Sequence, residues 1–324
     1  MFFDQGLSGL NAAAQSLNVL GKNIANGSTV GYKTARVNFT DTMANTLNTA
    51  SSGVSLQTGA GPVSSNIQQL FTQGTITTTT NPLDVAINGR GFYQLTDPTT
   101  SKVSYTRDGQ FQVNNAGNLV AADGQKVSGY AAVGGVVGAA IVPLNLSGFG
   151  TFQGNAALGL TADANSPLSG YSINPDGTIV GTYAVSTSLA SQATTAAAAI
   201  VPISPSTTLT AAQQTQLTAL NAVSNSPSTQ VTLGQLVLAS FPSETGLSAL
   251  GTNSWVQTSQ SGAPTIGAPG VGGLGALQSS AVETSNEDQT SDMVGLLAAQ
   301  RAYQANAQTI KAEDQMAQTL VNLG

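Results

Sequence analysis

Four aspartates in the middle of the chain are the residues whose type could do chemistry. Asp84, Asp108, Asp123 and Asp176 could act as paired catalytic carboxylates or bind calcium. Each stands beside a turn residue or in a predicted strand, and a turn aspartate commonly bonds its own backbone. Turn formation therefore explains these residues better than catalysis does.

Other catalytic and cofactor-binding patterns are weak or missing. Gly89-Arg90-Gly91 is a fragment of a glycine-rich loop, but no helical pattern follows it, so it does not predict phosphate binding. The chain contains no Cys and no His. This composition removes disulfides, thiol nucleophiles, Cys/His zinc sites and histidine general bases. We predict that the chain is not an enzyme and carries neither a cofactor nor a metal.

The composition also limits the partners. The 324 residues are 40% hydrophobic but only 7% charged, and the net charge of −6 comes with nine scattered basic residues, which argues against nucleic acid. No stretch reaches the roughly 18 apolar residues of a membrane span, so membrane insertion is not expected. The opening MFFDQGLSGL lacks both a basic region and an unbroken apolar core, so we expect no cleaved signal peptide.

Elements that could position an interaction surface stand at the two ends. Apolar side chains recur there every three, four or seven residues, at Leu7, Leu10, Leu17, Leu20 and Ile24 and again at Leu296, Tyr303, Ile310, Ala317 and Leu320. Such a narrow stripe fits a partner helix better than a broad core. We predict helices over 1–26 and 284–324 that pair as a coiled coil, form an inner helical domain and contact neighbouring subunits through these residues.

The predicted ends of both helices rest on capping signals. Asp4 is a suitable N-cap for the first helix, and Gly27 a left-handed cap at its end. Thr284 and Glu287 fit a capping box for the last helix.

The region between the helices is expected to be β-rich, giving an α+β multidomain chain in which the terminal helices enclose mainly antiparallel β domains. Asn88-Gly89 between alternating segments predicts a hairpin, and Trp255 should anchor the second β segment. A helix is expected over Thr210 to Val223, with Leu217 and Leu220 facing inward. The predicted parts are an extended linker (27–70), a β domain in two segments (71–145 and 229–283) and an outer inserted domain (146–228).

Residues 27–70 show no steady period. A compact domain seldom contains so long a loop without structure, so the segment is expected either to be disordered in the monomer or to lie extended on neighbouring subunits. Asn26, Gly31, Tyr32 and Lys33 are the expected contact residues at its start.

An ordered set of motifs resembles the bacterial flagellar rod and hook proteins. Near the N-terminus these are Gly9-Leu10-Asn11-Ala12-Ala13, Asn23-Ile24-Ala25-Asn26 and Thr29-Val30-Gly31-Tyr32-Lys33. In the middle they are Leu83-Asp84-Val85-Ala86-Ile87, Gly91-Phe92-Tyr93, Tyr105-Thr106-Arg107-Asp108-Gly109, Gly234-Gln235 and Gly275-Ala276-Leu277-Gln278-Ser279. The last helix contributes the run from Gln300 to Gln308, Asp314-Gln315 and Leu320-Val321-Asn322. Together they cover about two thirds of the chain.

Within this family the chain is most similar to hook subunits, by its length, its ending and the place of its insertion, although 146–228 is short and poor in charge for a hook. The resemblance implies a homopolymer, a helical tube outside the cell envelope that carries torque from motor to filament while bending. It also implies rod and hook–filament junction proteins as partners at the ends, and a cap protein and the flagellar type III export apparatus during assembly.

Three alternatives remain open at this level. The chain could be a distal rod subunit, which should form a straight, rigid assembly. It could instead be an exported enzyme that acts on envelope glycans through an Asp/Glu pair, or a surface adhesin that binds through the Thr/Ser-rich residues 146–228.

Overall fold

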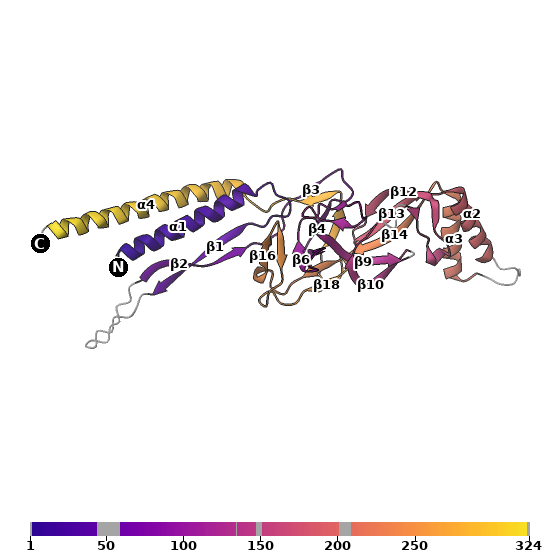
Figure 1. Ribbon diagram of the computed structural model, residues 1–324, viewed down its shortest axis with the longest axis horizontal. Coiled ribbons are helices and arrows are strands. Elements are labelled where there is room, and N and C mark those ends of the chain that lie inside the picture. The colour runs from indigo at the N-terminus through magenta and orange to yellow at the C-terminus, as the bar shows by residue number, and fades with distance from the viewer. Residues whose placement is uncertain (1, 44–58, 134, 147–150, 201–208, 323–324) are drawn as a thin grey trace. The chain divides into compact units, whose positions relative to one another are not determined.

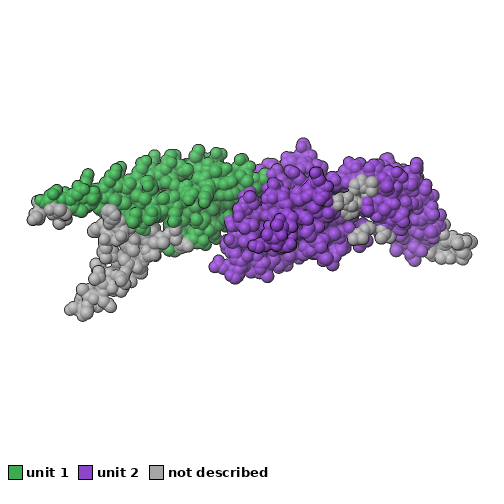
Figure 2. Space-filling view, viewed as in Figure 1, with its two compact units in different colours: residues 1–74, 285–324 green, residues 75–284 purple. Residues whose placement is uncertain are grey.

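The chain forms two compact units. The computed structural model, shown in Figure 1, describes residues 2–43, 59–133, 135–146, 151–200 and 209–322. One unit combines residues 1–74 with 285–324, and the other holds residues 75–284 (Figure 2). The first unit is therefore built from both ends of the chain, and we call it the terminal unit; the second is the β unit.

Two helices and one β-hairpin make up the terminal unit. They are α1 (Phe2–Ala25), β1 (Ala35–Met43), β2 (Gly59–Gln69) and α4 (Gln289–Asn322). The two helices lie side by side in Figure 1, and the start of α1 lies beside the later part of α4, so they run antiparallel. The expected terminal helices are thus confirmed, while coiled-coil packing between them stays a prediction.

The caps of both helices differ from those expected. Asp288, not Thr284, caps α4, because its Oδ1 accepts hydrogen bonds from the backbone N–H groups of Thr290 and Ser291, each at 3.1 Å. Gly27 does not adopt the left-handed conformation expected of it after α1, and the first glycine beyond the helix with a positive φ is Gly31, at 69°. Capping depends on where the flanking chain turns, which a sequence pattern fixes only to within a few residues.

The extended linker predicted for 27–70 is wrong where the structure describes it. β1 and β2 pair antiparallel from Ala35↔Gln69 to Met43↔Gly59, and both strands pack against α1. Register shifts between Asn38 and Phe39 and between Asp41 and Met43 interrupt the period of two along this hairpin, which accounts for the missing alternation. The segment 44–58, also part of the predicted linker, lies outside the described residues.

Antiparallel strands dominate the β unit. Its strands are β3 (Ile76–Thr78), β4 (Val85–Asn88), β5 (Phe92–Thr96), β6 (Val103–Thr106), β7 (Gln112–Val113), β8 (Leu119–Val120), β9 (Lys126–Val133), β10 (Val136–Pro143), β11 (Thr151–Phe152), β12 (Asp163–Ile173), β13 (Thr178–Ala184), β14 (Ser228–Leu236), β15 (Leu238–Ser240), β16 (Ser248–Gly251), β17 (Ser254–Val256), β18 (Thr265–Gly267), β19 (Ala276–Ser279) and β20 (Ala281–Glu283). Within the described residues, the largest sheet runs in the order β11-β12-β13-β14-β9-β5-β6-β17-β16 along its main path. The unit also contains two short 3₁₀ turns, Ala156–Leu158 and Glu244–Gly246, and the helices α2 (Thr187–Ile200) and α3 (Ala211–Asn225).

Aromatic side chains fill part of the core of the β unit. Trp255 is buried, and its ring meets the edge of Phe92 at 5.7 Å. Phe92 also contacts Phe241, which in turn packs against Tyr105 at 4.8 Å. Edge-to-face contacts of this kind add to the burial of large apolar surfaces. The expectation that Trp255 anchors the second β segment is confirmed.

The hairpin predicted at Asn88-Gly89 does not form. β4 pairs with β19 and not with the following β5, which pairs with β6, β9 and β15. Gly89 and Gly91 have φ of 119° and 126°, and a Cβ on Gly89 would lie 2.9 Å from the Cα of Gly275. The glycines therefore change the direction of the chain and let β19 pack closely against β4. The local sequence does not distinguish this use of Asn-Gly from a two-residue hairpin turn.

Two helices follow β13 in the predicted outer domain: α2 (Thr187–Ile200) and α3 (Ala211–Asn225). α3 confirms the expected helix, with Thr210 as its N-cap and Leu220 buried, whereas α2 was not expected. β13 pairs with β14 from Thr178↔Gln235 to Ala184↔Ser228. The main sheet therefore continues into residues 163–184, and the two helices occupy the connection between neighbouring strands.

Across the described residues, no helix combines the length and hydropathy that crossing a bilayer requires.

A buried ion pair ties the end of the β unit to its centre. Nη1 of Arg107 lies 3.3 Å from Oε2 of Glu283, and the two side chains are 2% and 0% exposed. Nη1 also donates to the carbonyl of Gly89 at 3.0 Å, and the guanidinium lies over the ring of Phe92. A buried charge that loses its partner is strongly destabilising, so both charges depend on each other.

Replacing Arg107→Met should lower the free energy of unfolding of the β unit by about 3–5 kcal/mol, because the buried carboxylate of Glu283 would lose its ion pair with Arg107. Trp255 fluorescence during urea unfolding measures this effect. Arg90→Met is the matched control: Arg90 meets Glu244 at 3.7 Å with 74% of its side chain exposed, so its loss should change stability by less than about 1 kcal/mol. Equal effects of the two substitutions would contradict the importance of the buried pair.

Candidate functional site

Glycines allow the backbones of α1 and α4 to approach each other closely along the seam between the two helices. A Cβ on Gly6 would lie 2.9 Å from Cγ1 of Ile310, and one on Gly9 would lie 2.7 Å from Nδ2 of Asn306. Farther along, Gly295 of α4 faces the Leu20 side chain at 3.5 Å. Small residues at these positions let the two helix backbones approach, so the contact is narrow and close rather than broad.

The structure divides the predicted stripe residues between the seam and solvent. Leu10, Leu17, Leu20, Ile24, Leu296 and Ile310 are half-buried, whereas Leu7, Tyr303 and Ala317 are exposed. The side chain of Leu320 lies outside the described residues. Leu20 and Ile310 contact the opposite helix, but the full set does not form one continuous seam. Their role in contacts between subunits stays a prediction.

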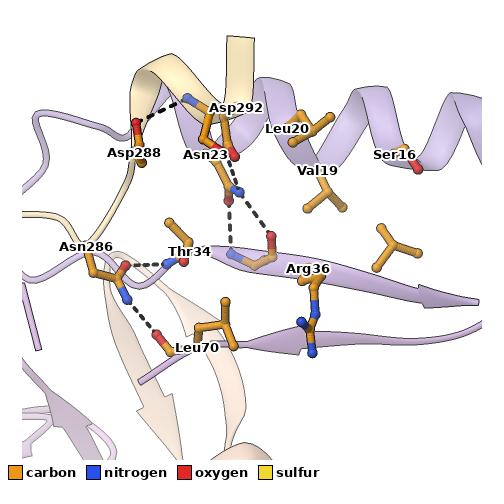
Figure 3. A pocket seen from close by; sticks show the side chains of 13 residues that line it. Ser16, Val19, Leu20, Asn23, Thr34, Arg36, Leu70, Asn286, Asp288 and Asp292 are labelled. Carbon is orange, nitrogen blue, oxygen red and sulfur yellow. Dashed lines mark hydrogen bonds between the residues drawn. The ribbon is translucent and has the colours of Figure 1, made fainter. Parts of the chain in front are cut away.

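Asn23 joins the elements of the terminal unit at one point (Figure 3). Its Nδ2 donates to Oδ2 of Asp292 in α4 at 2.9 Å and to the carbonyl of Ala35 in β1 at 3.0 Å. Its Oδ1 accepts from the N–H of Ala35 at 3.0 Å and from the hydroxyl of Tyr32 at 3.1 Å. The buried amide thus makes four hydrogen bonds, which fix α1, β1 and α4 in register.

Asn286, just before α4, makes a second junction with the base of the hairpin. Its Oδ1 accepts from the N–H of Thr34 at 2.8 Å, and its Nδ2 donates to the carbonyl of Leu70 at 2.8 Å (Figure 3). The same amide lies 2.9 Å from Oγ1 of Thr72. Lys33 is also buried here and donates from Nζ to the carbonyl of Thr72 at 2.7 Å. The two ends of the chain are therefore held together by side chains that bond backbone groups.

The predicted linker residues Asn26, Gly31, Tyr32 and Lys33 all take part in contacts within the terminal unit. Asn26 donates to the carbonyl of Lys22 at 2.8 Å at the end of α1, and Gly31 and Lys33 are buried. Burial, followed by the charges of Glu287 and Asp292, raises the pKa of Tyr32. These contacts explain the residue types at this position; contacts with other subunits stay a prediction.

A cavity of about 400 Å³ lies beside this junction (Figure 3). Val19, Leu20, Val37 and Leu70 supply apolar walls, and Asn23, Asn286, Asp288 and Asp292 supply polar ones. In the described part of the chain, no three acidic side chains come together in a way that would hold a metal ion. The cavity is a space between α1, β1 and the start of α4.

The central aspartates shape turns, as the sequence predicts. Oδ1 of Asp108, Asp123 and Asp176 each accepts a hydrogen bond at 3.0 Å from the backbone N–H two residues on. Asp84 accepts from Nδ2 of Asn81 at 2.8 Å. Burial, and after it the charges of Asp123 and Asp84, raises the pKa of Asp108.

Sequence reasoning missed the residues that form the seam and the junction. Gly6, Gly9 and Ala13 follow one another at a spacing of three or four, and Asn23 continues the same face after Val19. A stripe of small residues that ends in a polar side chain is the signal that could have found them. An apolar count overlooks it, because glycine and asparagine add no hydrophobicity.

Gly9→Leu should weaken the pairing of α1 with α4 by about 1–3 kcal/mol, because the new side chain must displace Asn306. Amide hydrogen exchange in both helices measures the loss. Gly21→Leu is the matched control on the same helix, since a Cβ there meets nothing within 4 Å, and it should leave the protection unchanged or raise it. Loss of protection in both variants would contradict close packing at Gly9.

Asn23→Ala should cost about 1–3 kcal/mol, because it leaves the backbone of Ala35 and the hydroxyl of Tyr32 without their buried partner. Protease resistance of the hairpin 35–69 should fall in parallel. The exposed Asn18 on the same helix provides the control, and Asn18→Ala should have little effect. An unchanged hairpin in Asn23→Ala would show that the junction is held by other contacts.

Three family models match the chain. The flagellar hook protein FlgE/F/G D1 domain matches residues 86–181, and the flagellar basal body rod FlgEFG protein C-terminal model matches residues 278–323. The flagella basal body rod protein model matches residues 3–33. The first falls in the β unit, and the other two cover α4 and α1 with its following loop.

Curated relatives match over nearly the whole chain. The flagellar hook protein FlgE of Escherichia coli (strain K12) is 32% identical over 413 aligned positions that include 100% of both chains, and FlgE of Salmonella typhimurium is 31% identical with the same coverage. The flagellar basal-body rod protein FlgG of Caulobacter vibrioides is 30% identical over 98% of this chain and 96% of its own. With this identity over its full length, the chain belongs to the flagellar hook and basal-body rod protein family, whose members are structural subunits of the flagellum and not enzymes.

Proposed function

We propose that this chain is the subunit of the flagellar hook, which polymerises into a bent helical tube outside the cell envelope and transmits torque from motor to filament. The observation that carries the proposal is the apolar surface of the terminal unit. A single copy leaves much of that surface in water, and identical neighbours are the partners that a family of polymerising subunits supplies.

The exposed apolar residues gather on α4. Val294 and Leu297 are 63% and 55% exposed, Met293 and Met316 are similarly exposed, and Tyr303 shows 38% of its surface. α4 has 34 residues and is about 50 Å long, whereas α1 has 24. Since Gly6 faces Ile310, the last turns of α4 extend past the start of α1. A helix so poorly covered by its own chain supports burial against other copies.

Low charge supports close packing of copies in the outer layers. Between Lys126 and Glu244 only Asp163 and Asp176 are charged, so few ion pairs need to break when neighbouring surfaces slide. Such surfaces suit a tube that bends while it rotates. In this proposal the terminal unit forms the inner layer and residues 146–228 contribute the outer surface.

The hook assignment rests on the coverage of the hook relatives. The alignments with hook relatives include every residue of both chains, and they extend over 413 positions although this chain has 324 residues. The hook relatives therefore contain segments that this chain lacks, which agrees with its short outer region. The distal rod is the alternative, because the FlgG relatives are 30% identical over 98% of the chain.

Further partners follow from the same proposal. A hook would join a rod protein at one end and hook–filament junction proteins at the other, and it would assemble beneath a cap protein. Its subunits would leave the cell through the flagellar type III export apparatus.

Purified full-length chain should polymerise into tubes that negative-stain electron microscopy shows as curved. The double substitution Val294→Ser and Leu297→Ser should raise the critical concentration at least about tenfold, because it removes apolar surface that neighbours would bury. Sedimentation measures this concentration, and circular dichroism checks that the helices remain.

Leu250→Ser is the control for loss of exposed apolar surface, since Leu250 in β16 of the β unit is 61% exposed, and it should polymerise more readily than the double variant. Straight, rigid tubes would assign the chain to the distal rod. A full-length chain that stays monomeric at high concentration, with α1 and α4 resistant to protease, would contradict the proposal.

A further inference from the structure

The cavity in the terminal unit has apolar walls that stay partly open to solvent. Its volume is about 400 Å³, and Val19, Leu20, Val37 and Leu70 line it from α1, β1 and the end of the hairpin (Figure 3). Leu20, Val37 and Leu70 are half-buried rather than fully buried. A volume of this size is typical of pockets that bind small ligands, so the cavity can take an aliphatic side chain.

The charge at the other end of the cavity is negative. Asp288 and Asp292 line it from the start of α4. Arg36 also borders the cavity, but it is exposed, and its side chain points away from α1 in Figure 3. A partner that fills the cavity should therefore present an apolar side chain together with a cation.

α4 carries such a combination on its solvent-exposed side. Val294, Leu297 and Arg301 are all exposed, and they follow one another at spacings of three and four residues. Side chains at these spacings share one face of a helix. Gly295, which lies against Leu20 of α1, falls on the opposite side at 3.6 residues per turn. We call Val294, Leu297 and Arg301 the outer face of α4.

We propose that the outer face of α4 in one copy docks into the cavity of the next copy, with Leu297 against the apolar walls and Arg301 beside the acidic end. The inference rests on the proposed function, because it names the surface that buries part of the exposed helix. The cavity and the outer face are different surfaces of one subunit, so their contact is head-to-tail. Each added copy then offers a free cavity or a free outer face, and the contact builds a filament rather than a closed dimer.

Complementarity in shape and charge favours a second copy as the occupant. Helices pack by inserting a side chain of one into a hole between residues of its neighbour, and Leu297 would fill the cavity in this way. The guanidinium of Arg301 would meet Asp288 and Asp292 with the opposite charge. In a family of polymerising subunits, identical copies are also the partners that lie closest during assembly.

The absence of Cys from the chain allows a direct test on the full-length polymer. Val37→Cys and Leu297→Cys are introduced together, and tubes are grown under reducing conditions and then oxidised. Non-reducing gels should show a ladder of covalent multimers, because a head-to-tail contact links each copy to two others. Val37→Cys with Met316→Cys is the matched control: Met316 is exposed on the same helix but far from Leu297, so it should give no ladder.

A change of charge provides a second measurement. Arg301→Glu should raise the critical concentration for polymerisation roughly fivefold, because it places a carboxylate beside Asp288 and Asp292. Lys311→Glu makes the same change of charge at another exposed position of α4, and it should change the critical concentration less. Sedimentation measures both values.

Hydroxyl-radical labelling tests the contact in the unsubstituted chain, so the test remains decisive even if a variant fails to assemble. Val37 and Leu297 should both lose labelling when monomers become tubes, because each would be covered by the other copy.

A ladder that appears with Val37→Cys and Leu297→Cys but not in the control supports the docking. Tubes that form without this ladder overturn it and leave the proposed function standing, since the copies then meet through other surfaces and the cavity has another occupant. Equal ladders in both variants, equal effects of Arg301→Glu and Lys311→Glu, or unchanged labelling of Leu297 also overturn the docking. A chain that forms no tubes overturns the docking together with the proposed function.

Discussion

The terminal unit depends on one buried amide. Asn23 stands where α1, β1 and α4 meet, and its side chain satisfies both polar backbone groups of Ala35, the Tyr32 hydroxyl and the Asp292 carboxylate. Residues 269 positions apart in the chain are thereby held in contact. A buried polar group of this kind adds modest stability but specifies one arrangement, because any shift would leave several groups unpaired.

The rest of the terminal unit follows from that fixed point. With α1 and α4 held in register at Asn23, the glycines at Gly6 and Gly9 come to lie opposite Ile310 and Asn306, and the helices can approach closely. Asn286 and Lys33 hold the base of the hairpin in the same way. The small residues of the helix pair line this internal seam, whereas larger apolar residues such as Val294 and Leu297 are exposed to solvent. The division between an internal seam and an exposed apolar surface is what a subunit needs if it must fold alone and then assemble.

The β unit is held together by a buried ion pair rather than by a buried amide. Its ends come together at β3 and β20, and the buried pair of Arg107 and Glu283 links β20 to β6. Because both charges are buried, separating β20 from β6 would break this ion pair at a high cost in free energy. In the proposed hook, the β unit would keep its own fold while the terminal unit provides the contacts for assembly.

The sequence by itself determined the features that depend on near neighbours. The terminal helices, the helix after Thr210 and the turns made by Asp108, Asp123 and Asp176 all arise from periodicity, capping and turn chemistry within a few residues. The ordered motifs were also sufficient to indicate the family. These features can be predicted from the sequence because the interactions that produce them are local.

Only the tertiary structure decided which distant residues meet. The hairpin 35–69 forms in a segment without a steady period, because its two strands pair with each other and pack against α1. Asn88-Gly89 turns toward a partner strand almost 190 residues away, since β4 pairs with β19 rather than with its neighbour. The seam at Gly6 and Gly9 likewise depends on antiparallel packing of the two chain ends. Such pairings depend on the free energy of the whole fold, which cannot be deduced from a short stretch of sequence.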